Sequence, residues 1–354
     1  MASPLRSTAV SETDRIAFSE YLRGSKNVMA LLGAGLSAAS GLPTFRGAGG
    51  LWRSHYVTSL ATPEAFQSKP ALVWQFYSYR RHMALKAQPN KAHFALAALA
   101  KRNPNFITLS QNVDGLSPRA NHPASQLHLL HGSLFQVKCS SLLCKYVAED
   151  YNDPIVPALA IPKAAPQPVP SATNKTGEEA TKNLFSAMEW KGDLTPQRRW
   201  QQQQQQQQQQ QNQRPLSSAS KAEGAELNIS DANVPIPSIS GADLPKCPKC
   251  KNQLLRPGVV WFGESLPQQT INAVDDWIDH ADKIDLILVI GTSAQVFPAA
   301  GYVEMAREKG ARAAVINMDT NDEPPGGMLP GDWFFQGDAS VIVPELLRDA
   351  IGEV

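Results

Sequence analysis

Short apolar runs recur along this chain, and several are followed by stretches with helical periodicity. The runs lie at 27–32 (NVMALL), 106–110 (FITLS), 258–262 (GVVWF), 285–290 (DLILVI) and 313–317 (AAVIN). A run that is apolar throughout predicts a strand covered on both faces, as in a parallel sheet. Helices are expected at 69–87, 91–101, 298–309 and 340–351. The alternation predicts an α/β fold with a Rossmann-like, doubly wound parallel sheet.

The stretch from 151 to 243 breaks this pattern. It contains PKAAPQPVP, an unbroken run of glutamines at 201–211, and ANVPIPSIS. Few of these residues can join a core, so most of the stretch is expected to be disordered. We interpret the glutamine tract as a repeat expansion in a surface loop; the alternative is a segment that makes coiled-coil or condensate contacts.

Composition narrows the class of protein. The chain has 354 residues, of which 42% are hydrophobic, enough for one large domain or for a large and a small one. The 33 basic and 32 acidic residues leave a net charge of +1, which predicts no direct nucleic-acid partner and no membrane partner. Without a signal-peptide core or a membrane-spanning run, a soluble intracellular protein of the cytoplasm or nucleus is expected, with the mitochondrion as an alternative. The oligomeric state stays open.

All four cysteines fall into two close pairs. Cys139 and Cys144 form a C-x4-C pair, and Cys247 and Cys250 form a C-x2-C pair. Four thiolates close the tetrahedral shell of Zn²⁺ and leave no position for water, so one structural zinc ion is predicted. The alternative is two unrelated pairs of buried free cysteines.

A glycine-rich turn, Gly33-Ala34-Gly35, follows the first apolar run. Such a turn allows close backbone approach, and the helix after it can offer N–H groups to a pyrophosphate. Pro43 excludes an ordinary Rossmann helix here. A dehydrogenase would carry an acidic residue roughly 20 positions further on, whereas the first acid downstream is Glu64. A glycine turn without any ligand is the alternative.

The segment GAGLSAASGLPTFRG (33–47) resembles the signature of the sirtuins, the NAD-dependent protein-lysine deacylases. Further segments follow in the family's order: QNVD at 111–114, HG at 131–132, the cysteine pairs, VWFGE at 260–264, GTS at 291–293, and the asparagine at 317. The resemblance implies a large Rossmann-type domain at 15–135 and 255–354, with 45–100 contributing a helical part of the smaller lobe. It also implies a zinc module at 136–254, interrupted by the insertion at 151–243, and an active site in the cleft between the two.

In the reaction that the resemblance implies, the acyl-lysine oxygen attacks C1′ of the nicotinamide ribose and nicotinamide leaves. His131 is then the expected base, because a neutral imidazole suits deprotonation of a ribose hydroxyl; His128 is the rival histidine, and the HG pair selects His131. Asn112 is the second expected catalytic residue, and Asp114 either orients the nicotinamide or caps a helix. The residues expected to bind NAD are Gly33, Ala34, Gly35, Ser37, Phe45, Arg46, Trp52, Gln111, Asn112, Val113, Asp114, Gly291, Thr292, Ser293, Asn317, Met318, Asp319 and Ala339.

Tyr77 and Arg80 lie three positions apart, which places them on one face of the predicted helix. A guanidinium beside a phenol makes a receptor for a carboxylate. The pair resembles the Tyr-x-x-Arg of the class III sirtuin branch acting on malonyl-, succinyl- and glutaryl-lysine, and Ala61 resembles that branch's small residue. The alternative is an amphipathic helix whose arginine faces solvent. The segment that includes Val260, Phe262, Gly263 and Glu264 is expected to pair with the substrate backbone as an added strand.

The sequence therefore predicts an NAD-dependent deacylase that acts on acylated protein lysines and yields nicotinamide and O-acyl-ADP-ribose. It is expected to prefer negatively charged acyl groups and to deacetylate weakly. The alternatives are a general NAD-dependent protein deacetylase, a mono-ADP-ribosyltransferase, a dehydrogenase, and a non-catalytic scaffold that uses the glutamine-rich loop.

Overall fold

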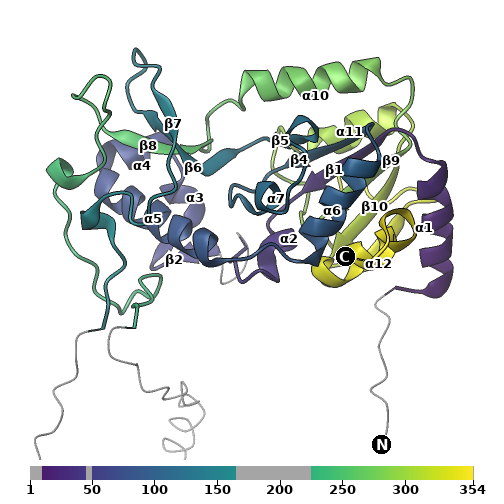
Figure 1. The fold of residues 1–354 in the computed structure, drawn as a ribbon, viewed down its shortest axis with the longest axis horizontal. Coiled ribbons are helices and arrows are strands. Elements are labelled where there is room, and N and C mark those ends of the chain that lie inside the picture. Colours follow the sequence, from purple (N-terminus) through teal and green to yellow (C-terminus); the bar gives the residue numbers. More distant parts are fainter. Residues whose placement is uncertain (1–9, 45–49, 165–224, 354) are drawn as a thin grey trace, which may run out of the picture. The chain divides into compact units, whose positions relative to one another are not determined.

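A parallel sheet lies at the centre of the computed structural model, which describes residues 10–44, 50–164 and 225–353 (Figure 1). The order of its strands is β11-β10-β9-β1-β4-β5, and each neighbouring pair is parallel. The strands are β1 (Val28–Leu32), β4 (Phe106–Ser110), β5 (Leu127–Leu129), β9 (Leu286–Ile290), β10 (Arg312–Asn317) and β11 (Trp333–Gln336). Every residue of β1, β4 and β9 is buried, as their largely apolar sequences predict.

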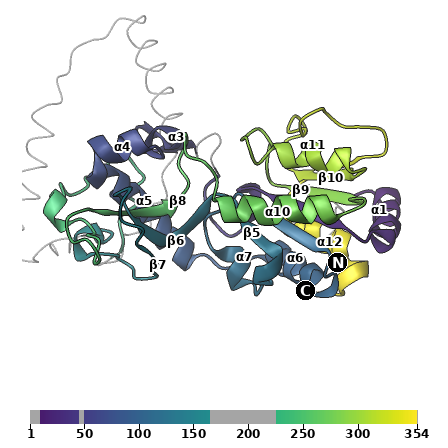
Figure 2. The ribbon, with the colours of Figure 1, turned by 90° about the horizontal axis from the view of Figure 1, so that it is seen from above.

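Helices cover both faces of this sheet, which confirms the predicted doubly wound fold. On one face, α1 (Glu12–Gly24), α6 (Lys91–Arg102) and α12 (Ala339–Ile351) contribute to one apolar core. On the other, α10 (Gln268–His280) and α11 (Gly301–Glu308) contribute to a second core. Figure 2 shows α11 on one side of the sheet and α6 and α12 on the other. Among the described residues, no helix has both the length and the apolar character needed to cross a membrane.

The chain leaves β1 and β9 in opposite directions along the sheet, and their carboxyl ends meet at this switch point. The N–H of Gly33 donates to the carbonyl of Ile290, and that of Gly35 to the carbonyl of Gly291, both at 2.9 Å. A Cβ added at Gly33 would lie 2.5 Å from the Cβ of Thr292, so the turns require glycine in order to approach each other. In doubly wound sheets, ligands bind outside the strand ends at such a point.

A small antiparallel sheet has the order β7-β6-β8. Its strands are β6 (Gly132–Cys139), β7 (Val147–Glu149) and β8 (Leu255–Val259). The strand predicted at 258–262 is therefore wrong in both extent and partner, because β8 ends at Val259 and pairs with β6 outside the central sheet. An apolar run reports burial and not the identity of its neighbour. This sheet also extends beyond the limits of 136–254 predicted for the zinc module.

Short elements and one long helix connect β1 to β4. They are α2 (Gly35–Ala38), β2 (Leu51–Trp52), β3 (His55–Tyr56), α3 (Val57–Leu60), α4 (Pro63–Ser68) and α5 (Pro70–Lys86), followed by α6. Helix α5 packs on the small sheet, where the indole N–H of Trp74 donates to the carbonyl of Leu255 at 2.9 Å. Helix α6 shares an apolar core with the central sheet instead, although most of it falls in the range 45–100 predicted to contribute to the smaller lobe. Between β4 and β5 lie α7 (Leu116–Arg119) and η2 (Ala124–Gln126).

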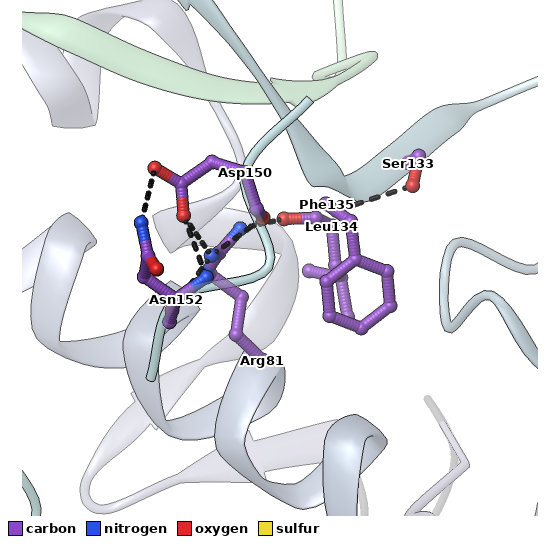
Figure 3. Close-up of polar contacts among 6 residues, drawn as sticks. All are labelled: Arg81, Ser133, Leu134, Phe135, Asp150 and Asn152. Carbon is purple, nitrogen blue, oxygen red and sulfur yellow. Dashed lines mark hydrogen bonds and ion pairs between the residues drawn. The ribbon is translucent and has the colours of Figure 1, made fainter. Parts of the chain in front are cut away.

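Arg81 holds α5 to the small sheet (Figure 3). This side chain is 2% exposed, and its guanidinium donates to the carbonyls of Leu134 at 2.6 Å, Asp150 at 2.8 Å and Asn152 at 3.1 Å. It also forms an ion pair with the carboxylate of Asp150 at 3.0 Å. The next residue along α5, His82, contacts the carboxylate of Asp153 at 2.7 Å. Helix α5 is therefore tied to the chain just before the long insertion.

The predicted disordered insertion has structured ends at 151–164 and 225–243, which include η3 (Pro157–Leu159) and η4 (Gly241–Asp243). The guanidinium of Arg53 binds the returning chain through the carbonyls of Ile229, Asp231 and Val234 at 2.8–3.1 Å. Composition could not reveal this order, because a distant side chain satisfies these backbone groups. The described residues divide into one unit at 10–44, 50–160 and 229–353 and a second that includes 161–164 and 225–228. The glutamine tract lies outside the described residues.

Candidate active site and cysteine cluster

His131 follows the short strand β5 and precedes β6. Its Nδ1 lies 3.0 Å from the carbonyl oxygen of Gln111, so Nδ1 carries the hydrogen and donates it. Nε2 is consequently the unprotonated nitrogen, and among the described residues it has no hydrogen-bond partner. Burial lowers the pKa of His131, and the bond to Gln111 acts in the opposite direction. The ring is therefore neutral at physiological pH and presents a free lone pair, as a general base requires.

Gln111 and Thr292 join the ends of β4 and β9. The hydroxyl of Thr292 donates to the side-chain oxygen of Gln111 at 3.2 Å, whereas the buried amide nitrogen of Gln111 has no partner among the described residues. The half-buried hydroxyl of Ser293 likewise has no protein partner in the described part of the chain. A buried polar atom without a partner is costly, and a hydroxyl-rich ligand such as a ribose would satisfy it. These residues fit the predicted cofactor.

Ser37, Asn112 and Asp114 form a cluster beside this point, in which Ser37 and Asp114 are buried and Asn112 is half-buried. The hydroxyl of Ser37 donates to Asp114 at 2.7 Å, and the amide of Asn112 donates to the carbonyl of Gly33 at 2.9 Å and to Ser37 at 3.4 Å. The second oxygen of Asp114 accepts from the N–H of Leu116 at 2.9 Å, the local capping contact that sequence left as an alternative. Ser37 was expected to bind cofactor oxygens, but its proton is already used by Asp114.

His93 stands behind this cluster and was missed at the level of sequence. It is 1% exposed; its Nδ1 accepts from the N–H of Asn90 at 3.2 Å, and its Nε2 lies 3.5 Å from the hydroxyl of Ser37. Burial lowers the pKa of His93 to about 4, so the ring stays neutral although Asp114 acts in the opposite direction. The only sequence signal was a histidine three positions after a helix-capping asparagine.

The glycine turn offers less to a pyrophosphate than its sequence indicated. The N–H groups of Gly33 and Gly35 already bond to β9 and the turn after it, and those of Leu36 and Ser37 bond within the turn. Helix α2 spans Gly35–Ala38 alone. The glycines of the turn therefore allow close backbone approach, but most of the N–H groups expected to bind a pyrophosphate are already hydrogen-bonded within the chain.

Several other predicted cofactor residues occupy different settings. Asn317 links the ends of β10 and β9, because its amide donates to the carbonyl of Thr292 at 3.0 Å and to Asp322 at 3.1 Å. Met318 is 66% exposed, whereas Trp52 is 3% and Ala339 4% exposed. Ala339 belongs to the apolar core, which leaves its side chain no role at a ligand. Ala34 and Val113 line a pocket beside α5, and Gly291 follows the end of β9. The carboxylate of Asp319 accepts a hydrogen bond from the N–H of Asn321. Phe45 and Arg46 lie outside the described residues.

A pocket opens between α5 and the residues that follow β4. It is lined by Ala34, Ser37, Leu42, Pro43, Tyr79, Arg80, Met83, Ala84, Asn112, Val113, Asp114 and Leu134. Burial lowers the pKa of the Arg80 guanidinium, and the neighbouring Tyr77 and Asp114 act in the opposite direction. Arg80 is half-buried and lines the pocket. Sequence missed Tyr79, Met83 and Leu134, for which helical spacing from Arg80 and proximity to the HG pair were the available signals.

Tyr77 lies on α5 one turn before Arg80, and its side chain is fully buried. Its hydroxyl accepts a hydrogen bond from the indole N–H of Trp261 at 2.9 Å. Burial raises the pKa of Tyr77 to about 12, so the phenol keeps its proton. Phe66 packs against the same indole, with ring centroids 5.3 Å apart. Ala61 is 7% exposed and accepts from the N–H of Phe262 at 2.9 Å.

The segment predicted to pair with a substrate backbone has few free N–H groups. That of Val260 donates to His131, that of Phe262 to Ala61, and that of Trp261 to the carboxylate of Glu264, all at 2.9 Å. Glu264 itself is bound by the guanidinium of Arg256. Pairing of this segment with a substrate backbone stays a prediction, and among the described residues the N–H of Gly263 has no hydrogen-bond partner.

The two cysteine pairs meet in space. Their sulfur atoms all lie within 4.8 Å of one another, with 3.7 Å between Cys139 and Cys250 and 3.8 Å between Cys144 and Cys247. Sulfur atoms about 2.3 Å from a tetrahedral zinc ion are separated by about 3.8 Å, so the cluster fits that ion. Cys139 is the last residue of β6, and Cys247 and Cys250 come shortly before β8. The cluster therefore connects two strands of the small sheet.

Together, these features define a nucleotide-binding α/β protein with a zinc module. Residues 33–298 match the Sir2 family. An NAD-dependent protein deacylase of Candida albicans is 42% identical over 95% of this chain and 98% of its own length. The mitochondrial NAD-dependent protein deacylase sirtuin-5 of Xenopus tropicalis is 34% identical over 85% of this chain and 76% of its own. A solved Sir2 homologue in complex with NAD aligns with a TM-score of 0.62 and 30% identity, over 96% of this chain and 93% of that one.

The chain belongs to the Sir2 family.

Proposed function

We propose that this chain is an NAD-dependent protein-lysine deacylase that prefers acyl groups ending in a carboxylate. The family and the deacylase relatives, which align along nearly the whole chain, support the NAD-dependent activity. The observation that carries the acyl preference is the position of Arg80, which lines the pocket one helical turn from the buried phenol of Tyr77.

When bound, NAD supplies the ribose carbon that accepts the acyl oxygen and the hydroxyl that finally carries the acyl group. His131 removes a proton from a ribose hydroxyl through its free Nε2, while Gln111 keeps the hydrogen on Nδ1. The unpartnered amide of Gln111 and the hydroxyl of Ser293 bind ribose oxygens. Asn112 and Asp114, held by Ser37 and Gly33, orient the nicotinamide carboxamide.

The acyl chain enters between Ala61 and the apolar face of Tyr77, and its terminal carboxylate binds Arg80 and the Tyr77 hydroxyl. Hydrogen bonds to a charged group are worth about 1.5–3 kcal/mol each, whereas an acetyl group makes neither bond. The difference in binding free energy favours the acidic acyl group, because the side chains of Arg80 and Tyr77 are already ordered before the substrate binds.

The acylated protein is held through its backbone, by the carbonyls of the 260–264 segment and the N–H of Gly263, so the neighbouring sequence has little influence. For the cellular location we propose an intracellular compartment. The curated sirtuin-5 relatives from frog and zebrafish are named mitochondrial proteins. Microscopy of the tagged full-length protein in its own cells separates mitochondrion from cytoplasm and nucleus.

The test is a competition between acylated peptides. Acetyl-, malonyl-, succinyl- and glutaryl-lysine forms of one peptide are incubated together with the enzyme and NAD, and mass spectrometry follows each. We expect the three acidic forms to be consumed first and O-acyl-ADP-ribose to appear. Preferential loss of the acetyl form would assign a general deacetylase instead, and ADP-ribose joined covalently to protein would assign an ADP-ribosyltransferase.

A further inference from the structure

We infer that Trp261 determines acyl selectivity without touching the acyl group, by holding the hydroxyl of Tyr77 in the orientation that donates to the acyl carboxylate. This inference rests on the proposed acidic-acyl preference and adds a positioning residue to it. Its basis is a single hydrogen bond, 2.9 Å long, that joins residues 184 positions apart in the chain.

The direction of this hydrogen bond is fixed by chemistry. An indole N–H can only donate, so the oxygen of Tyr77 must accept. The hydroxyl group of a phenol has a single hydrogen, and in Tyr77 this hydrogen cannot point at Trp261. Among the described residues, no acceptor takes it. The proton of Tyr77 is therefore left without a protein acceptor in the described part of the chain, and a phenol that already accepts a bond is a stronger donor.

The indole is itself held firmly in place. The guanidinium carbon of Arg256 lies 3.3 Å from the centroid of the Trp261 ring, and Phe66 packs at 5.3 Å. Glu264 binds Arg256 at 2.8 Å and the backbone N–H of Trp261 at 2.9 Å. Trp261 is 2% exposed. Glu264, Arg256 and Trp261 thus form a rigid support that ends at the Tyr77 hydroxyl.

This support is separate from the cofactor cluster. None of these three side chains lines the pocket that Arg80 shares with Asn112 and Asp114. A change at Trp261 should therefore alter recognition of the acyl end and leave the steps that depend on His131 intact. A residue that is merely structural would lower the rates on all acyl groups together.

The first experiment compares kcat and KM of wild type, Trp261→Phe, Tyr77→Phe and the double variant on succinyl- and acetyl-peptides at saturating NAD. At position 261, phenylalanine retains an aromatic ring and removes the indole N–H. We expect Tyr77→Phe to lower kcat/KM for the succinyl peptide by about 10-fold or more, and Trp261→Phe to lower it by about 3- to 10-fold. The ratio of the succinyl to the acetyl kcat/KM should therefore fall in both single variants, and the double variant should resemble Tyr77→Phe alone.

Trp74→Phe is the matched control. Trp74 is as buried as Trp261 and also donates its indole N–H at 2.9 Å, but to the backbone carbonyl of Leu255. This variant should lower the melting temperature and leave the succinyl-to-acetyl ratio unchanged. An equal change of that ratio in Trp74→Phe and Trp261→Phe would reduce Trp261 to a structural residue.

A second measurement uses the unaltered protein. With ¹⁵N-labelled tryptophan, the indole N–H signal of Trp261 should shift when a succinyl peptide binds and much less with an acetyl peptide, because only the former engages the Tyr77 proton. In Tyr77→Phe this difference should vanish. Equal shifts with both peptides would overturn the inference even if Trp261→Phe does not fold.

The variant Arg80→Met distinguishes a failure of the proposed preference for acidic acyl groups from a failure of the role inferred for Trp261. If Arg80→Met keeps the preference for succinyl groups, the proposed acyl specificity itself is wrong. If Arg80→Met abolishes that preference while Trp261→Phe retains it, the proposed specificity stands and only the role of Trp261 is wrong.

Discussion

The two ends of the site are built in different ways. The cofactor end collects residues that directly follow β1, β4 and β9, and many of their polar atoms are already bonded to each other. The acyl end joins α5 to the segment after β8, mainly through aromatic rings and one indole N–H. A polar network set by sheet topology should control turnover, whereas a helix–loop contact can change selectivity without disturbing the cofactor.

The largest effect should follow loss of zinc, because the cysteine cluster clasps the small sheet that supports the acyl end. In Cys144→Ser or in chelated protein, we expect bound zinc to be lost, the module at Cys139–Cys250 to become sensitive to protease, and deacylation to fall to background. Leu142→Ser is the control, since Leu142 lies in the same turn and is 99% exposed. Full activity in demonstrably zinc-free protein would remove the structural role.

Replacing His131 should affect every acyl group equally. We expect His131→Asn to lower kcat by about 10²- to 10⁴-fold on succinyl and acetyl peptides alike, because a general base is lost. In wild type, activity should fall as pH drops through the lowered pKa of His131 and stay level above its ordinary value. His128→Asn, on β5 three residues earlier, is the matched control and should remain active. A loss confined to one acyl group would contradict the division between the two ends.

Replacing Arg80 should affect one acyl class only. Arg80→Met removes the charged partner of the acyl carboxylate, so kcat/KM for the succinyl peptide should fall about 10- to 100-fold. The acetyl peptide should be almost unaffected, because it never contacts the guanidinium. Lys86→Met removes a positive charge from an exposed position on the same helix and should change neither value. Equal losses on both peptides would mean that Arg80 serves the cofactor end.

The smallest effect concerns the pH dependence of stability and belongs to the cofactor end. Because burial lowers the pKa of His93 to about 4, the unfolded chain binds a proton between about pH 6.5 and 4 that the folded chain does not. The free energy of unfolding should therefore decrease as pH falls through this window, by roughly 2 kcal/mol between pH 7 and 5 from this group. Urea unfolding of wild type and His93→Gln at both pH values measures the difference. His122, buried elsewhere with a pKa of about 4, contributes with the same sign and is present in both proteins. Identical pH dependence in wild type and variant would contradict this role.

The resemblance to the sirtuins supplied the residues expected at the cofactor end, and parallel topology brings Gln111 and Thr292 together, because they follow the carboxyl ends of β4 and β9. The sequence also predicted both cysteine pairs, whose spacing is local. It did not predict that β8 leaves the central sheet, that Trp261 meets Tyr77, or that His93 supports Ser37 and Asp114. Each of these depends on contacts between segments far apart in the chain. Arg53 is a further example, because its guanidinium binds backbone carbonyls of Ile229 and Val234, in a segment whose own composition indicates disorder.

The central claim is that an NAD-dependent site and a carboxylate receptor serve one reaction. Its most direct test is the release of nicotinamide by the purified full-length protein, measured with a succinyl-lysine peptide and with its unmodified counterpart. We predict nicotinamide and desuccinylated peptide in equal amounts with the first, and only a trace of nicotinamide with the second. No nicotinamide release above that trace with the succinyl peptide would contradict the account.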